Sequence, residues 1–118
     1  MLLKPSLAAS AFAIVATAAF AQTTGQPASD KEAMSGYMAV MDKMQSSTMM
    51  MSSSGDADAD FLRMMIPHHQ SAIDMAQVEL ANGDDEETRA LAEKIIEAQK
   101  AEIEEIKGML ERMGVAAP

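Results

Sequence analysis

Hydrophobic side chains recur with a helical period in three segments of the chain. In the first segment they follow steps of three and four and form one stripe of a helix at ~100° per residue. The stripe consists of Met34, Met38 and Met41, with Tyr37 and Met44 at its edges. The pattern predicts a short amphipathic helix, and Ser29 or Asp30 is the expected N-cap.

A second periodic segment predicts a helix from about Asp58 to Ala81, with Asp58 or Asp60 as its cap and an Asn-Gly pair after its end. One face of this helix carries Phe61, Met65, His68, Ala72, Met75 and Glu79, with Met64 close beside them. Pro67 lies inside the segment, where it removes a hydrogen-bond donor and crowds the preceding turn. We therefore expect a kink or a local break there, and we expect the face of His68 to point into the bundle.

A third helix is expected to begin at Asp84 and Asp85, whose acidic side chains suit its cap, and to run to about Met113. Its predicted apolar face consists of Leu91, Ile95, Ala98, Ile106, Met109 and Met113, with Glu102 lying within it. Between the first two helices, a stretch rich in Met, Ser and Asp near 46–57 breaks the period and predicts a loop. Three helices without a strand signal predict an all-α small helical bundle at 30–114.

The N-terminal end of the chain has the pattern of a signal peptide. A short basic start and an apolar, Ala-rich stretch precede an Ala-Phe-Ala sequence, which predicts cleavage after residue 21 and export to the periplasm. Residues 22–29 are polar and contain Gly and Pro, so they predict a flexible leader. Removing 21 of the 118 residues leaves 97, enough for one small domain, and no stable membrane insertion is expected after cleavage.

Composition narrows the chemistry that this domain can perform. The formal net charge of −9 disfavours nucleic acid and anionic lipid as partners. The chain has no cysteine, so disulfides and thiolate metal sites are excluded. It has 13 methionines but only three Phe, one Tyr and no Trp. Methionine fills cores, but its thioether is also a soft ligand that suits Cu(I), so the methionine stripes have two interpretations.

Several classes of enzyme lack their motifs in this sequence. Di-iron bundles use Glu-x-x-His pairs, but Met65 and Ile66 hold the positions three before the two histidines. The sequence contains no His-Glu-x-x-His motif, no glycine-rich phosphate loop and no nucleophile elbow. We therefore expect a protein without catalytic turnover.

A metal site is the chemistry that the remaining polar residues favour. His68 and His69 are the only histidines, and their helical neighbours at three, four and seven residues are methionines: Met64, Met65 and Met75. Imidazole and thioether together favour copper, Cu(I) above all, with Cu(II) as a second choice. Adjacent helical residues diverge by ~100°, so whether the pair shares one ion stays open. The alternative is an ordinary buried histidine beside core methionines.

Two further sets of side chains have a structural and a functional interpretation. Glu102 either orients a histidine or binds the ion, or it reaches outward to solvent or to a basic side chain. Met38 and Met41, with the other methionines of 34–51, either pack in the core or form a second, weaker Cu(I) site.

The sequences DFLRMMIPHHQSAIDMA (60–76) and AQKAEIEEIKGML (98–110) resemble the CopM-like family, a domain-of-unknown-function family of periplasmic proteins. The resemblance implies a ferritin-like helical fold, copper binding, and a role as a copper chaperone or in copper tolerance. It points to Met64, Met65, His68, His69 and Met75, and to the pair Gln99 and Glu102. Ile106 and Met109 depart from the family pattern, which has Met and an aromatic residue there.

The sequence as a whole predicts a periplasmic copper-binding protein, a metallochaperone or buffer that contributes to copper tolerance. Its expected partners are the copper ion and other periplasmic copper-handling proteins, and a homodimer that shares ligands between chains stays open. Two rival hypotheses are a Met-rich helical interaction module without a metal, which would grip peptides by adaptable packing, and a metal-dependent oxidase.

Overall fold

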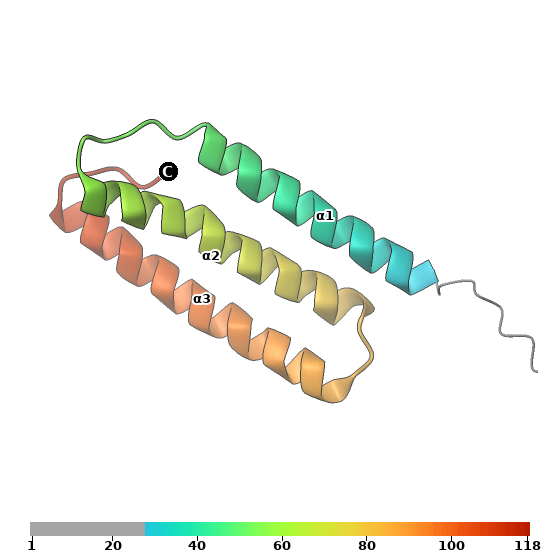
Figure 1. Ribbon diagram of the computed structural model, residues 1–118. Coiled ribbons are helices and arrows are strands. Elements are labelled where there is room, and N and C mark those ends of the chain that lie inside the picture. Colours follow the sequence, from blue (N-terminus) through green and yellow to red (C-terminus); the bar gives the residue numbers. More distant parts are fainter. Residues whose placement is uncertain (1–27) are drawn as a thin grey trace, which may run out of the picture.

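Three long helices and their connections make up the computed structural model, which describes residues 28–118. Helix α1 spans Ala28–Met49, α2 spans Ala57–Asn82 and α3 spans Glu86–Arg112. They run alternately up and down and are joined by short connections (Figure 1). No strand occurs in this part of the chain. The predicted all-α architecture of three helices is therefore confirmed.

Acidic side chains cap the second and third helices. The Asp56 carboxylate accepts hydrogen bonds from the backbone N–H groups of Asp58 and Ala59, and α2 starts directly after it. The cap thus lies two residues before the predicted Asp58. At the start of α3 the carboxylate of Asp85 accepts from the Thr88 N–H, as the sequence predicted. Both caps place negative charge at the positive end of a helix dipole.

Helix α1 is longer at both ends than its sequence predicted. It begins at Ala28, so the expected cap residues Ser29 and Asp30 lie inside its first turn. It continues to Met49, and the hydroxyls of Ser47 and Thr48 donate to backbone carbonyls one turn earlier, at 2.9 and 3.0 Å. These bonds satisfy the hydroxyls without leaving the helix. The connection between α1 and α2 is therefore limited to residues 50–56 rather than 46–57.

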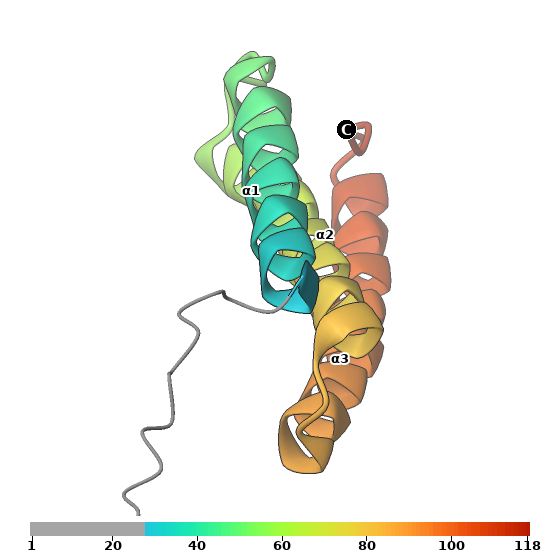
Figure 2. The ribbon, with the colours of Figure 1, turned by 90° about the vertical axis from the view of Figure 1, so that its right-hand side faces the viewer.

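Helix α2 is the central element of the fold. It packs against α1 on one side and α3 on the other, whereas no Cα atoms of α1 and α3 come within 8 Å of each other (Figures 1 and 2). Gly36 lets α1 approach closely, because a Cβ there would lie 3.0 Å from the side chain of Val78. An ion pair between Lys43 and Asp74, at 2.8 Å, also joins α1 to α2.

The main hydrophobic cluster lies between α2 and α3. It is formed by Ala59, Ile106 and Leu110, with Leu62, Met65, Ile66 and Val115 packed against it. Gly114 has a φ of 68°, a conformation that favours glycine, and this turns the chain so that Val115 returns to the cluster. The N–H of Val115 donates to the Leu110 carbonyl at 3.0 Å. At this end of the α2–α3 pair, Ala59 and Leu110 have no exposed surface.

The predicted inward faces of α2 and α3 are largely wrong. On α2, Phe61 is 61% exposed and His68 is exposed, while the buried side chains are Ala59, Ser71, Ile73 and Ala76. On α3, Leu91 is 57% exposed, whereas Ala92 next to it is buried. Only Ile106 of the predicted α3 face is buried. The physical reason is the open arrangement: each outer helix packs closely along α2 but not along the other outer helix, so a second apolar stripe on it stays uncovered.

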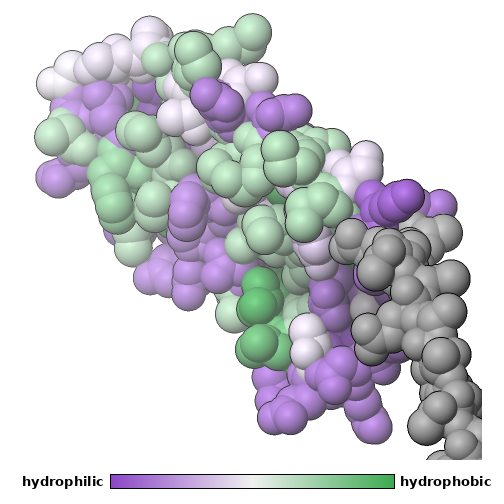
Figure 3. Space-filling view, turned by 45° about the vertical axis from the view of Figure 1, so that its right-hand side comes forward, coloured by the Kyte–Doolittle hydropathy of each residue, from purple (hydrophilic) through white to green (hydrophobic). Residues whose placement is uncertain are grey.

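Because the helices lie side by side in one layer, the molecule has two broad faces. On α2, Ser71 and Val78 point toward α1, and Leu62 and Ile73 point toward α3 from the opposite side of the helix. A third side of α2, together with neighbouring residues of α1 and α3, forms a polar face. This face includes Lys43, Gln70, Asp74, Lys100, Glu104 and Lys107. The other contributes to what we call the methionine face: Met34, Tyr37, Met38, Met41, Phe61, Met64, His68, Met75 and Leu91. Apolar side chains form a band across this side of the molecule in Figure 3.

Three other expectations concern Pro67, the N-terminus and the membrane. Helix α2 continues through Pro67 without a break, and a bend at that residue stays a prediction.

The predicted signal peptide (1–21) lies outside the described residues, as does the leader (22–29) except for the two residues that begin α1. None of the three helices is long and apolar enough to span a bilayer.

Leu110 has no exposed surface, so we expect its truncation to destabilise the fold strongly. Leu110→Ala removes apolar contacts and leaves a cavity, and it should lower the free energy of unfolding by about 2–5 kcal/mol. Met50→Ala is the control because the side chain of Met50 is 87% exposed. Urea unfolding followed by circular dichroism measures both. Equal stability of the two variants would contradict the assigned core.

Candidate metal site on α2 and α3

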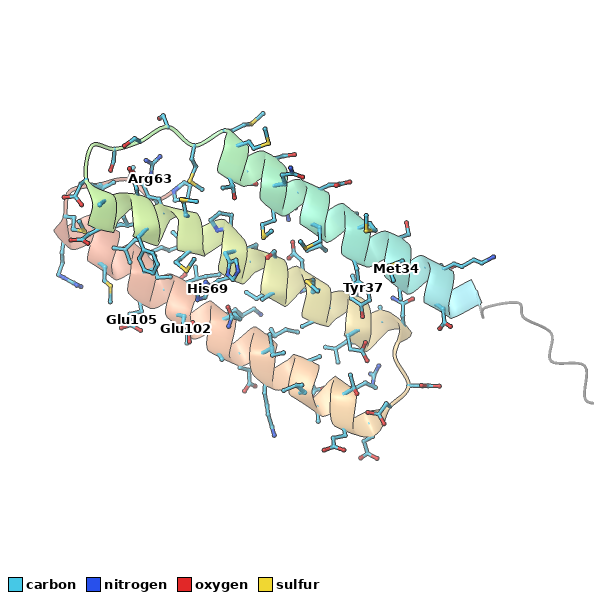
Figure 4. The ribbon with its side chains drawn as sticks, viewed as in Figure 1. Met34, Tyr37, Arg63, His69, Glu102 and Glu105 are labelled. Carbon is cyan, nitrogen blue, oxygen red and sulfur yellow. The ribbon has the colours of Figure 1, made fainter. Side chains whose placement is uncertain are left out.

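His69 and Glu102 meet between α2 and α3. The His69 side chain is only 13% exposed, and its Nε2 lies 2.6 Å from Oε2 of Glu102. Its other ring nitrogen, Nδ1, lies 2.8 Å from the backbone carbonyl oxygen of Met65. Figure 4 shows the imidazole directed from α2 toward α3. The sequence had left open whether Glu102 contacts a histidine or reaches outward, and the structure places it on His69.

The contact with Met65 defines the role of one ring nitrogen of His69. A carbonyl oxygen only accepts, so Nδ1 of His69 carries a hydrogen and donates it to Met65. Nε2 faces the carboxyl group of Glu102, and a metal ion would bind at this nitrogen. The bond from Nδ1 to a carbonyl fixes the tautomer and ring orientation that such ligation requires.

His68 lies on the methionine face and is exposed. Its ring centroid is 6.0 Å from that of His69, and the two ring planes are inclined by 63°. The adjacent histidines thus diverge as the helical period predicts: His69 turns to α3 and His68 to the open face. Within the part of the chain that the structure describes, no three His, Asp or Glu side chains converge as a metal site. An ion bound here would therefore need thioether ligands as well.

The candidate methionines of α2 lie in different environments. Met65 packs against the hydrophobic cluster and presents its carbonyl to His69. Met64 is 47% exposed and lies beside Met51 in a hollow between the 50–56 connection and α2. Met75 is 39% exposed and lines an apolar groove. Met64 and Met75 are accessible thioethers on the same side of α2 as His68, whereas Met65 has mainly a packing role.

The methionines of α1 are mostly exposed. Met34, Met38 and Met41 are 57%, 57% and 43% exposed, so the core interpretation of this stripe is wrong for these three side chains. Met44 is half-buried, and its sulfur accepts a hydrogen bond from the Ser71 hydroxyl at 3.2 Å. Met38 and Met41 stay candidates for a second soft-metal site, because their sulfurs face solvent.

An interaction between Tyr37 and Glu79 was not predicted from the sequence. The Tyr37 hydroxyl donates to Oε2 of Glu79 at 3.0 Å, which links α1 to α2. Both side chains line the apolar groove with Met75 and Leu91, and the groove has a volume of about 290 Å³. Burial, together with the hydrogen bond and negative charge of Glu79, raises the pKa of Tyr37 above its ordinary value of 10.0. Spacing alone placed each residue on its helix but gave no sign of the contact between them.

Because Tyr37 is the only tyrosine and the chain has no tryptophan, its ionisation is directly measurable. We expect the phenolate absorbance to appear with a midpoint above pH 10.0, since the folded structure favours the neutral phenol. Glu79→Gln removes the negative charge and should move the midpoint toward the ordinary value, while Glu93→Gln on α3 should leave it in place. A wild-type midpoint at or below 10.0 would show that the contact is absent.

One family model matches most of the chain. It covers residues 8–110 and is described as a domain of unknown function, DUF305. A search of curated proteins finds no match. The three-helix structure agrees with the helical, ferritin-like character of this family. The chain is a member of the DUF305 family.

Proposed function

We propose that this protein binds copper, preferentially Cu(I), in the periplasm and acts as a chaperone or buffer for the metal. Copper is the cargo in this account rather than a resident cofactor. The residues assigned to it are His68, His69, Met64, Met75 and Glu102, with Met65 as the backbone support of His69. Met38 and Met41 contribute a second, weaker site on α1.

The observation that carries the proposal is the anchoring of His69. Its Nδ1 is held by the Met65 carbonyl, and its Nε2 is directed at Glu102 near the surface of α3. Histidine ligands of metals are commonly oriented by such a hydrogen bond on the second nitrogen. Glu102 is 53% exposed, so an ion can approach this point from solvent.

The surrounding donors favour a soft metal. Thioethers of Met64 and Met75 are accessible on the face that also carries His68. Sulfur and imidazole donors select Cu(I) over calcium or magnesium, which prefer oxygen ligands. A cysteine-free, methionine-rich donor set also suits an oxidising compartment, because thioethers do not form disulfides.

The rival function is an interaction module without a metal, and the exposure of the methionine face favours it. Flexible methionine side chains adapt to varied partners. The two proposals differ in their dependence on the histidines: copper binding requires His68 and His69, whereas packing of a peptide on the methionine face does not. Copper carried by the protein after growth in copper-supplemented medium would also distinguish them.

We expect competition against a Cu(I) chelator under reducing conditions to show tight binding that depends on both histidines. The double variant H68A/H69A should lose roughly 100-fold or more in affinity, because each imidazole is a direct donor. Gln70→Ala, an exposed neighbour on the same helix, is the control. Ag(I) should compete with Cu(I), and Zn(II) should not. Unchanged affinity in the double variant would refute the assignment.

Glu102→Gln tests the contribution of the α3 carboxylate. It should weaken Cu(I) binding by roughly 10–100-fold, the usual effect of removing a group that orients or supports a metal ligand. Glu105→Gln is the matched control, since Glu105 is also an exposed carboxylate on α3 (Figure 4). Equal affinities for the two variants would remove Glu102 from the site.

A further inference from the structure

The methionine face is too large and too apolar to be an ordinary protein surface. Seven large hydrophobic side chains on it are between 39% and 61% exposed: Met34, Met38, Met41, Phe61, Met64, Met75 and Leu91. Helical domains normally bury an apolar face against a second layer, and here the single layer of three helices leaves it uncovered. Some other surface is therefore expected to cover it.

The area of this face matches what a stable dimer buries. The exposed fractions of the seven side chains add up to about 3.6 fully exposed side chains, or roughly 700 Å² at ~200 Å² each. A standard protein interface buries about 800 Å² per partner. The methionine face is thus close to the size of one complete interface.

Charge does not prevent this face from packing against a copy of itself. The carboxylates of Glu79 and Glu102 beside this face are already bound within their own chain, Glu79 by the Tyr37 hydroxyl and Glu102 by His69. The net charge of −9 would favour a cationic partner on a charged surface, but Gln70, Asp74 and Glu104 lie on the opposite, polar face with Lys43, Lys100 and Lys107. An apolar and self-complementary partner fits better.

The face also carries a projection and a groove that can fill one another. Phe61 projects from the first turns of α2 and is 61% exposed. The groove of about 290 Å³ lies around Met75, fourteen residues later on the same helix, which corresponds to ~21 Å. His68 lies midway between Phe61 and Met75 on α2. If two α2 helices pair antiparallel around a two-fold axis near His68, each Phe61 lies over the groove of the other copy. Such reciprocal contacts are the mark of an isologous interface.

We propose that the methionine face is the interface of a homodimer, in which two three-helix layers stack with antiparallel α2 helices and Phe61 fills the partner's groove. The dimer forms without metal, and its two-fold axis passes near His68. This goes beyond the proposed copper binding and does not depend on it; in the dimer, His68, Met64 and Met75, which are accessible in the single chain, lie at the interface.

The test is the mass of the metal-free protein in solution. Sedimentation equilibrium with a chelator present should give twice the chain mass at micromolar concentration. Leu91→Glu, which puts a charge in the interface, should raise the dissociation constant by roughly 100-fold or more. Met50→Glu is the control, because Met50 is exposed but lies in the 50–56 connection. Circular dichroism shows that each variant keeps its helices.

A crosslinking measurement tests the position of the axis. The chain has no cysteine, so a single one introduced as His68→Cys should form an intermolecular disulfide under mild oxidation. Gln77→Cys on the polar face should not. A monomeric wild-type protein would overturn the proposal. It would also be overturned if the monomer used this face to bind amphipathic peptides or lipid vesicles. A dimer unaffected by Leu91→Glu, or crosslinked only through Gln77→Cys, would also overturn it.

Discussion

The whole structure depends on α2 packing against two different helices on opposite sides. No Cα atoms of α1 and α3 come within 8 Å of each other, so α2 holds the two outer helices together in residues 28–118. Small residues make this possible: Ala59, Ser71 and Ala76 are buried on α2, and Gly36 brings α1 close to it. The same arrangement leaves two sides of α2 uncovered, one polar and one apolar.

This constraint separates the two adjacent histidines. A step of ~100° along the helix carries His69 into the contact with α3 and leaves His68 on the uncovered apolar side. His69 gains two fixed hydrogen bonds and low exposure, while His68 lies among accessible thioethers. The pair is better described as one anchored imidazole and one exposed imidazole than as a single two-histidine clamp. Copper binding, as proposed, would draw on both.

The helices could be predicted from the sequence because local signals specify them. Periodicity, acidic caps and Gly near the ends located α2 and α3 to within a few residues. The end of α1 was misplaced because Ser47 and Thr48 bond back to their own helix rather than ending it. Which stripe of each helix becomes buried is a tertiary property. On α3, the more hydrophobic stripe contains Leu91 and Ile95 and was therefore predicted to be buried. The stripe that is buried against α2 instead contains Ala92 and Ile103.

The candidate site was predictable in its residues and not in its contacts. The unusual sequence of two methionines, proline and two histidines identified the region, and Glu102 stood out as an acid in an apolar face. Nothing in the spacing showed that Glu102 meets His69 rather than His68, since that depends on the register of α3 against α2. The Met65 side chain, expected as a ligand, is partly buried against the cluster between α2 and α3, and its role as a ligand stays a prediction.

The most direct test of the account is X-ray absorption spectroscopy of the protein loaded with Cu(I). Sites that combine His68 or His69 with thioethers from α2 predict both nitrogen and sulfur in the first coordination shell of copper. The sulfur contribution should fall when Met64 and Met75 are changed to Leu, and the imidazole signal should fall in the double histidine variant. A first shell of oxygen and nitrogen without sulfur would contradict the account.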